Sequence, residues 1–341
     1  MYYLAMPLSI SRDRLAALLD AARTKRVLVV GDAMLDEYLV GDVDRISPEA
    51  PVPVVRVRER RHALGGAANV AQNVAAAGAS CRLVATIGAD SAGDQLASML
   101  VRAGIIGSDL VQVARSTTRK TRVVARSQQL VRVDEEDDHD LGAPDIERVL
   151  RAVHAAVASA DAVILEDYNK GMLVPVVIAG AIAAARARKL PVIVDPKYKH
   201  FFAYGGATVF KPNRRELEAA LGAAVDLEHP EAVPAALERL DVEYLLLTLG
   251  ERGMMLAGRS GVVDSVPTVA REVYDVVGAG DTVTAYLATV LASGGTAREA
   301  AVIANYAAGI EVGKLGAATV TPGEILAAYD EPATSSAPRS S

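Results

Sequence analysis

The sequence is poor in several features that would each point to a particular class of protein. It has one cysteine, Cys81, among 341 residues, so no disulfide can form within the chain, which fits a reducing compartment. Its longest apolar stretches are far shorter than the roughly 20 residues that cross a bilayer, and its first residues lack the pattern of a signal peptide. We therefore expect a cytoplasmic protein with no membrane partner.

Common nucleotide-binding and catalytic motifs are also missing. The string nearest to a Walker A motif, residues 309–314, lacks its glycine spacing and the Ser or Thr after the lysine. No G-x-G-x-x-G follows the first strand-like run, which argues against a standard nicotinamide enzyme. The five histidines show no paired spacing that would suit a metal site. No G-x-S-x-G is present, so hydrolysis by a Ser/His pair is unsupported. The net charge of −6 and the scattered Lys and Arg residues argue against nucleic acid as a partner.

Strand-like and helix-like segments alternate along most of the chain. Strands are predicted at 26–31, 82–88, 161–167, 191–196, 207–210 and 244–250, with a helix candidate after each of the last four. Because apolar strands separated by helices form mostly parallel sheets covered on both faces, we predict a three-layer α/β/α fold. One domain is expected over 26–330, after an N-terminal helix or tail over 1–25 and before a disordered Pro/Ser-rich tail over 331–341.

Two segments do not follow this alternation. Residues 36–64 have no helical period and contain three prolines, and residues 117–134 alternate in polarity. Such patterns are typical of antiparallel strands with one solvated face. We predict that both segments build a small β lid outside the main sheet.

The most informative segment is residues 273–294, where a strand-like run enters Gly278-Ala279-Gly280-Asp281 and a long apolar helix follows. The glycines let the backbone approach a ligand, and the free N–H groups at a helix start favour an anion. An aspartate there would repel a phosphate unless it accepts the proton of an attacking hydroxyl. The residues alone leave two interpretations: Asp281 is a general base beside an anion hole, or it only caps the helix.

A second candidate region begins with Gly65 and Gly66 before a helix, with Asn69 one turn into it. Paired glycines let backbone amides touch a ligand, and asparagine offers a donor and an acceptor to a sugar hydroxyl. The alternative is an ordinary helix start. Asp32 and Asp36 follow the first strand, where carboxylates commonly face the crevice. We expect one of the two to be only a turn or cap residue.

A third candidate pair is Asn213, which follows the strand predicted at 207–210, and Glu216, three residues later on the same helix face. This spacing is typical of an N-cap with a capping-box acid. It would also suit a water-bound Mg²⁺ near ATP phosphates, because Mg²⁺ takes few protein oxygens and keeps several waters. Both interpretations remain open.

Together these segments resemble the ribokinase-like, or phosphofructokinase B, carbohydrate kinases from about residue 26 to residue 328. "GGAANVAQNVAAAGA" (65–79) is similar to the first family signature, "DVVGAGDTVTAYLATVL" (275–291) to the second, and "PNRRE" (212–216) to the Asn-x-x-Glu element. The resemblance implies a ribokinase-like fold, ATP with Mg²⁺, Asp281 as base and 278–281 as anion hole. The residues that it places on the Mg-ATP side are Asn213, Glu216 (to Mg²⁺ through water), Thr248, Gly250 and Gly253.

Several longer strings are similar to the D-glycero-β-D-manno-heptose 7-phosphate kinases of that family, above all "RISPEAPVPV" (45–54). This resemblance implies phosphorylation of O1 of the heptose 7-phosphate, a step toward ADP-heptose. It implies sugar contacts from Asp36, Gly65, Gly66 and Asn69, and a pocket lined by Lys170 and Asp195. Candidates for holding the 7-phosphate are Arg122, Arg132, Lys170 and Lys197, and the sequence does not choose among them. Glu166 stands where serine is common in this group.

The resemblance also implies a monovalent cation, such as K⁺, which Asp275 and the backbone of Val277 could bind with residues 312–317. The lid strands would have exposed edges, and pairing two lids would cover them, so we expect a homodimer. Two alternatives remain open: a kinase of this fold for another phosphosugar, sugar or nucleoside, and a sugar-binding regulator without catalysis. The intact turn at 278–281 argues against the regulator, because a binder needs no base there.

Overall fold

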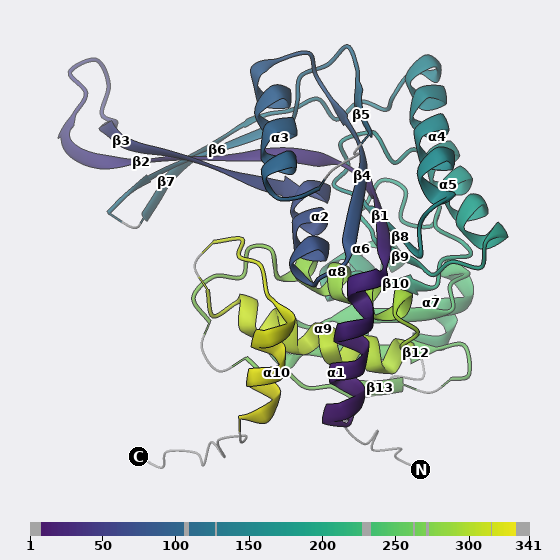
Figure 1. Cartoon of the computed structure of the whole chain (residues 1–341). Helices are drawn as coiled ribbons and strands as arrows, with labels where there is room; N and C mark the ends of the chain where they lie inside the picture. Colours follow the sequence, from purple (N-terminus) through teal and green to yellow (C-terminus); the bar gives the residue numbers. More distant parts are fainter. Residues whose placement is uncertain are drawn as a thin grey trace, which may run out of the picture.

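Strands from seven parts of the chain line up in parallel at the centre of the molecule (Figure 1). The computed structural model describes residues 8–105, 109–126, 128–226, 233–261, 263–270, 273–314 and 316–331. The main sheet has the order β13-β12-β11-β10-β9-β8-β1-β4-β5. Its strands are β1 (Arg26–Gly31), β4 (Ser80–Ile87), β5 (Asp109–Gln112), β8 (Ala162–Glu166), β9 (Val192–Asp195), β10 (Val209–Phe210), β11 (Tyr244–Thr248), β12 (Met254–Gly258) and β13 (Val263–Val266).

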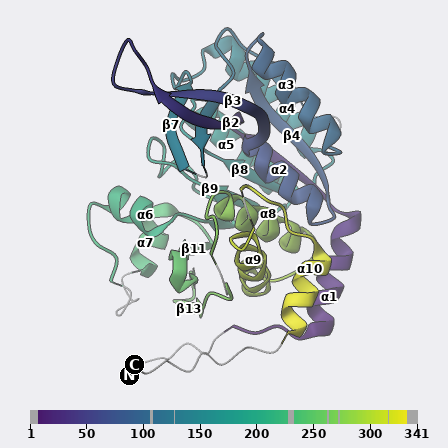
Figure 2. The same ribbon diagram turned by 90° about the vertical axis from the view of Figure 1, so that its left-hand side faces the viewer.

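Helices cover both faces of this sheet and give the molecule three layers (Figures 1 and 2). One face carries α1 (Arg12–Ala21), α2 (Ala67–Ala76), α3 (Ser91–Arg102), α8 (Ala279–Ala292), α9 (Ala297–Glu311) and α10 (Pro322–Asp330). The other carries α4 (Ala143–Val157), α5 (Pro175–Ala187), α6 (Arg214–Leu221) and α7 (Val233–Leu240). Two single-turn helices, η1 (Ala22–Thr24) and η3 (Gly250–Arg252), join neighbouring elements.

The continuous apolar run of β1 explains why both faces are covered. Successive strand side chains point to opposite faces, so Val27 and Val29 pack under α2 and α8, while Leu28 and Val30 pack under α4 and α5. Each of these four residues is at most 1% exposed. No helix in the described part of the chain combines the length and apolarity needed to cross a bilayer.

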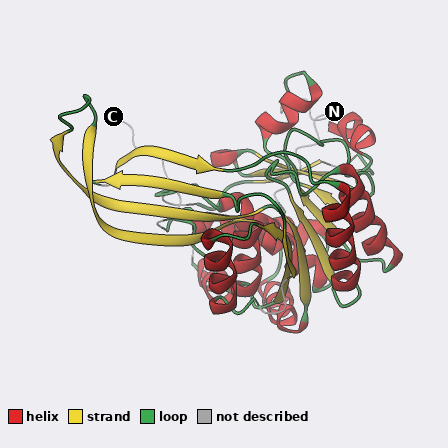
Figure 3. Ribbon diagram, turned by 90° about the horizontal axis from the view of Figure 1, so that it is seen from above, coloured by secondary structure: helices red, strands yellow, loops and turns green. Residues whose placement is uncertain are grey.

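A second sheet of four strands projects from the helical body, as the view from above shows (Figure 3). Its strands, in the order β3-β2-β6-β7, are β2 (Ala33–Ile46), β3 (Pro53–Gly66), β6 (Arg119–Ala125) and β7 (Gln128–Glu135). The start of β2 and the end of β3, which we call the root of the second sheet, are buried beside the main sheet. The other halves of the two strands are more exposed. This sheet comes from the two segments predicted to form a lid, and β2 and β3 extend beyond 36–64 at both ends.

The structure also corrects details of the prediction. The pairs β2–β3 and β6–β7 are antiparallel as expected, but β2 and β6 run parallel, so the second sheet is mixed. The segment after β11 forms η3 and then the antiparallel strands β12 and β13, where a helix was expected. The tail predicted to be disordered lies, apart from residue 331, outside the described residues.

The parallel strands end at one edge of the main sheet, and most candidate site residues lie there. Glu166 ends β8, Asp195 ends β9, Lys211 follows β10 and Thr248 ends β11. The carboxyl ends of parallel strands are the usual position of ligand sites in α/β folds. The second sheet arises at this same edge, since β2 begins two residues after β1.

Candidate active site

The turn Gly278-Ala279-Gly280-Asp281 forms the start of α8. Gly278 is the N-cap residue and has a left-handed backbone with φ of 97°. A Cβ atom at this position would lie 3.2 Å from Oε1 of Glu311 and 3.3 Å from Nδ2 of Asn69, so the site has little room for a side chain. The N–H groups of Gly280 and Asp281 belong to the first helical turn, which has no backbone acceptors of its own for them. The turn therefore presents donors suited to an anion.

Asp281 is not the capping residue, because Gly278 occupies that position and Asp281 lies three residues later. Its carboxylate instead binds side chains from distant segments: Asn69 donates from Nδ2 to Oδ2 at 2.6 Å, and Tyr168 donates from its hydroxyl to Oδ1 at 2.9 Å. Asn69 lies on α2 and Tyr168 on the loop after β8. The first turn of α8 is thus connected to the sugar-side candidate Asn69 by a direct hydrogen bond.

Burial gives the Asp281 carboxylate unusual acid–base properties. The residue is 5% exposed, and burial raises the pKa of its carboxyl to about 6. The hydrogen bond from Asn69 opposes this rise, while the nearby Asp195 carboxylate adds to it. A carboxylate with a pKa just below neutrality can accept a proton and still be ionised at pH 7.

One buried lysine, Lys211, lies close to Asp281. Lys211 is 3% exposed, and its Nζ atom lies 2.7 Å from Oδ2 of Asp195. The same Nζ would lie 3.6 Å from a Cβ atom on Gly280, which places this ammonium group beside the helix start. Burial alone would lower the pKa of Lys211, but Asp195 and Glu166 raise it above its usual value. The ammonium group therefore remains charged next to the anion-binding turn.

The sugar-side candidates converge on the root of the second sheet. Arg122 donates to Asp36 at 2.5 Å and lies over the Tyr38 ring, 5.3 Å from its centroid. A Cβ atom on Gly65 would come within 2.8 Å of the Asp36 carboxylate, so this glycine is needed for the close approach. These contacts put Asp36, Gly65 and Arg122 in one group.

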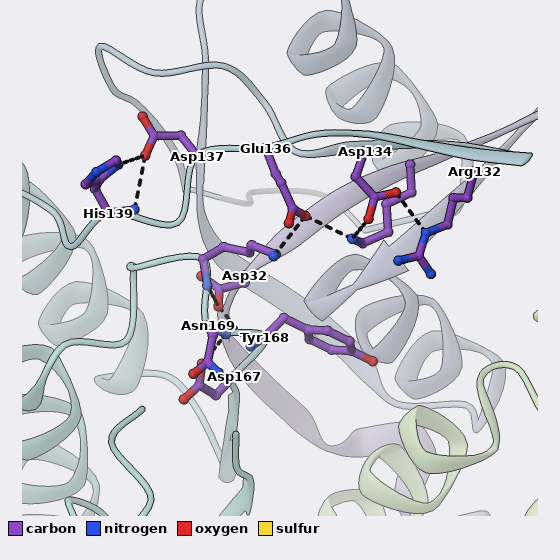
Figure 4. A network of polar contacts seen from close by, with 11 residues as sticks. Asp32, Arg132, Asp134, Glu136, Asp137, His139, Asp167, Tyr168 and Asn169 are labelled. Atoms are coloured by element: carbon purple, nitrogen blue, oxygen red, sulfur yellow. Dashed lines mark hydrogen bonds and ion pairs between the residues drawn. The ribbon is translucent and has the colours of Figure 1, made fainter. Parts of the chain in front are cut away.

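Asp32 binds the backbone of the loop after β8, as a turn residue does. Its carboxylate accepts the backbone N–H of Tyr168 at 2.9 Å (Figure 4). It also accepts the backbone N–H groups of Lys170 at 3.0 Å and Met172 at 3.3 Å. These bonds fix the loop after β8, which includes Asn169 with its positive φ of 54°. Asp32 therefore positions Tyr168 toward Asp281.

The remaining basic candidates lie in different surroundings. Lys170 pairs with Glu136 at 2.8 Å, and Lys197 pairs with Glu216 at 2.6 Å. Arg132 donates to Asp134 at 2.9 Å and lies on β7 with about half of its side chain exposed (Figure 4). Arg132 is thus the candidate with the fewest constraints on its position.

A cavity of about 620 Å³ is bordered by the turn. Four of the five nucleotide-side candidates, all but Glu216, line it together with two residues of the turn: Asn213, Thr248, Gly250, Gly253, Ala279 and Gly280. Much of the remaining lining is apolar, including Val273, Val276 and Val312. An apolar cavity that ends at a helix start suits a flat aromatic base joined to a phosphate chain.

Asn213 and Glu216 form the capping box that their spacing allowed. Oδ1 of Asn213 accepts from the N–H of Glu216 at 2.9 Å, and Oε2 of Glu216 accepts from the N–H of Asn213 at 2.8 Å. The other Glu216 oxygen accepts from Lys197. The pair therefore has a structural role at the start of α6, and Asn213 also lines the cavity, whereas Glu216 is buried.

Three residues at the site were not predicted from the sequence to take part: Lys211, Tyr168 and Glu166. Each lies at the end of a parallel strand or within two residues of it. That position was the signal used for Asp32 and Asp36, and it could have been applied to all strands alike. Burial raises the pKa of Glu166 well above its usual value, and the carboxylates of Asp195 and Asp281 add to this effect.

Comparisons with known proteins agree with this geometry. A family model described as "pfkB family carbohydrate kinase" matches residues 24–323. The "Bifunctional protein HldE" of Pelobacter propionicus is 46% identical over 318 residues, which cover 92% of this chain and 65% of that protein. The chain therefore spans less than two thirds of the length of that relative.

Solved structures share the fold. The ribokinase of Arabidopsis thaliana complexed with ribose and ATP has a TM-score of 0.71 at 20% identity, covering 91% of this chain and 100% of that one. Phosphofructokinase-2 of Escherichia coli in complex with potassium has a TM-score of 0.73 at 19% identity, covering 89% and 98%. These likenesses confirm the predicted ribokinase-like three-layer fold. With the family model matched over residues 24–323, the chain belongs to the pfkB family of carbohydrate kinases.

Proposed function

We propose that the enzyme transfers the γ-phosphate of ATP to O1 of D-glycero-β-D-manno-heptose 7-phosphate, with Asp281 as general base. The position of the Asp281 carboxylate is the observation that best supports this proposal. It is buried in the first turn of α8, next to the cavity lined by Ala279 and Gly280, and it is hydrogen-bonded to Asn69 on the sugar side. A base between donor and acceptor is what phosphoryl transfer to a hydroxyl requires.

In this proposal the triphosphate of ATP extends from the cavity toward the turn. The N–H groups of Gly280 and Asp281 donate to the γ-phosphate, and the Lys211 ammonium adds a positive charge beside them. Thr248, Gly250 and Gly253 line the nucleotide part of the cavity. Fixed donors of this kind stabilise the charge that develops during transfer.

The oxygen-rich edge formed by Asn213 and Glu216 fits Mg²⁺. Both Glu216 oxygens already accept hydrogen bonds, from Lys197 and from the Asn213 backbone, so an ion here would be reached through retained water. Bound Mg²⁺ neutralises part of the phosphate charge. Glu216 and Asn213 would hold its water shell, and Lys197 would keep the Glu216 carboxylate in place.

The acceptor is placed by the group at the root of the second sheet. Asp36 and the backbone at Gly65 and Gly66 bind sugar hydroxyls, and Arg122 binds the 7-phosphate from its position beside Asp36. The heptose assignment is supported by strings such as "RISPEAPVPV" and by the 46% identity with the bifunctional protein HldE. Lys170 and Asp195 complete the predicted pocket.

The chemical step then follows from these positions. The O1 hydroxyl attacks the γ-phosphorus in line, its proton passes to the Asp281 carboxylate, and the bond from the γ-phosphorus to the bridging oxygen breaks to release ADP. The second sheet covers the sugar and excludes water, which otherwise would act as an acceptor. Loss of the proton from Asp281 to solvent after product release resets the base.

Asp275 and Glu311 give the region behind the turn a negative character that suits K⁺. The N–H of Asp275 donates to the carbonyl of Val312 at 3.2 Å, so Asp275 lies beside the segment predicted to share the cation. Burial, together with Asp275 and Asp281, raises the pKa of Glu311 to about 8. A monovalent cation here would reduce the electrostatic repulsion between the Glu311 carboxylate and those of Asp275 and Asp281. Comparing turnover in K⁺ and in a bulky organic cation tests the assignment.

We further propose a homodimer through the second sheet. Val131 and Val133 on β7 and Val57 on β3 are each about half exposed, and β3 and β7 are the edge strands. Pairing two such sheets would cover both the apolar side chains and the unpaired edges. Sedimentation at micromolar concentration should give a dimer, and V131E should give a monomer; a wild-type monomer would contradict the proposal.

The experiment that tests the function is ³¹P NMR of the reaction of D-glycero-β-D-manno-heptose 7-phosphate with Mg-ATP. A new anomeric phosphate signal that appears together with ADP supports transfer to O1. A panel of other phosphosugars, sugars and nucleosides, followed by ADP release, tests the first alternative. Sugar binding without any ADP release would instead support the inactive regulator.

A further inference from the structure

Glu136 is an acid beside the second sheet that the reaction above does not use. Its Oε2 atom lies 2.8 Å from Nζ of Lys170 and 2.9 Å from Nζ of Lys120. The two lysines come from separate parts of the chain, since Lys120 lies on β6 and Lys170 on the loop after β8. One carboxylate oxygen thus bridges two ammonium groups. Such a position suits other oxyanions as well, because lysine binds carboxylates and phosphates alike.

Both lysines of this bridge are largely enclosed. The side chain of Lys120 is 14% exposed, and that of Lys170 is 15% exposed. Lys120 also pairs with Asp134 at 3.1 Å, and Asp134 extends the polar network to Arg132 (Figure 4). Lys170 pairs with no acid other than Glu136 among the residues that the structure describes. Because a mostly buried ammonium group loses much of its hydration, Lys170 needs an anion at this position.

The bridge lies on the sugar side of the second sheet. Lys120 and Arg122 are two residues apart on β6, so their side chains point to the same face of the sheet. Lys120 is in register with Asp36 on β2, and Arg122 donates to the Asp36 carboxylate. The two bridged ammonium groups therefore lie near the place proposed for the phosphate of the substrate.

Glu136 can leave the bridge without breaking a helix or a strand. It is the first residue after β7, and the pairing of β6 with β7 ends at Arg119 and Glu135. Residues 136–142, which lead to α4, form neither helix nor strand. Burial acts to raise the pKa of the Glu136 carboxyl, but hydrogen bonds from Lys170 and Lys120 lower it below its ordinary value. The side chain is thus an ionised carboxylate on a segment that can move.

We propose that Glu136 is an internal competitor for the substrate phosphate: it occupies the anion position between Lys120 and Lys170, and the phosphate displaces it. This rests on the proposed function, in which the substrate is a phosphosugar. A phosphate carries about 1.5–2 negative charges near pH 7 and has three acceptor oxygens, so it binds two ammonium groups more strongly than a carboxylate does. The competitor weakens the binding of every anion by the same factor. Free inorganic phosphate is thereby kept out, whereas a phosphosugar retains affinity through its sugar contacts.

Calorimetric titration of the full-length chain with inorganic phosphate tests the proposal without turnover. A non-hydrolysable Mg-ATP analogue is present throughout, so that the anion hole at 278–281 is filled. E136Q keeps the shape of the side chain but removes its charge, and K120M removes one of the two ammonium groups. The matched control is E135Q, because Glu135 is the neighbouring acid and pairs with Arg119 instead. The same variants are then titrated with heptose 7-phosphate and with the unphosphorylated heptose.

We expect E136Q to bind phosphate and heptose 7-phosphate about 10-fold more tightly than the wild type and E135Q, with unchanged affinity for the unphosphorylated heptose. K120M should bind both phosphate ligands about 10-fold more weakly. A gain in affinity cannot come from a misfolded variant. Phosphate affinity in E136Q that equals or falls below that of the wild type would overturn the proposal. If E136Q gains phosphate affinity but the wild type does not phosphorylate heptose 7-phosphate, the heptose assignment fails and the role of Glu136 stands.

Discussion

Asn69 and Asp281 are 212 positions apart in the chain, yet Nδ2 of Asn69 lies 2.6 Å from Oδ2 of Asp281. The contact joins α2 to α8, and Asn73 supports it by donating to the Asn69 carbonyl at 3.0 Å. Thr282 in turn donates to Asn73 at 3.1 Å. The two signatures recognised in the sequence therefore meet in space at the proposed base.

Replacing Asn69 with alanine should raise the pKa of Asp281. The hydrogen bond from Asn69 stabilises the charged carboxylate, and a bond to a charged group contributes about 1.5–3 kcal/mol, or about one to two pKa units. The acidic limb of kcat should therefore move to higher pH by that amount, as measured by ADP release across pH. A limb that stays in place in N69A would show that this bond does not tune the base.

The pH profile of the wild type follows from the same carboxylate. Asp281 must be ionised to accept a proton, and its pKa is raised to about 6. Since the active form is lost as the pH falls through this pKa, kcat should be nearly constant above pH 7 and drop about tenfold per unit well below pH 6. A profile that stays flat down to pH 4.5, where an ordinary aspartate is still ionised, would contradict the assignment.

Lys211→Met should slow phosphoryl transfer. The change removes the ammonium group beside Gly280 and leaves Asp195 without its partner. We expect kcat to fall about 10²–10³-fold, as for the loss of one donor to a developing charge, with a smaller change in KM for ATP. The double variant K211M/D195N is the control, because it removes the unpaired carboxylate. If it recovers full turnover, Lys211 only neutralises Asp195.

Arg122→Met should separate phosphosugars from sugars. If Arg122 binds the substrate phosphate, KM for the heptose 7-phosphate should rise about 10–100-fold, from the loss of a charge-assisted contact. Any turnover of the unphosphorylated heptose should change little. Arg132→Met is a suitable control, since Arg132 is half exposed and paired with Asp134. Equal losses with both sugars would indicate a structural role through Asp36.

The sequence was most informative where one local pattern determines one element. The apolar run 26–31 became β1 with the predicted bounds, and the helix expected after Gly66 became α2 at 67–76, followed by Gly78 with φ of 96°. These features depend on neighbours in the chain, such as burial on both faces or a glycine that ends a helix. They need no knowledge of distant partners.

Features that depend on distant partners were harder to predict. Alternating polarity indicates strands but not their direction, so the parallel pairing of β2 with β6 was missed. A hairpin after β11 needs only a short turn, and nothing in "MMLAG" distinguishes β12 from a buried helix segment. The burial of Lys211 beside Asp195 likewise follows from pairing between β9 and β10.

Turnover of Asp281→Asn measures the central claim most directly. The amide keeps the size of the side chain and can still bond Asn69 or Tyr168, but it cannot accept the hydroxyl proton. We predict that kcat, followed as ADP release with heptose 7-phosphate, falls about 10²–10⁴-fold while calorimetry shows nearly unchanged sugar affinity. Turnover of D281N at the wild-type rate would contradict the account.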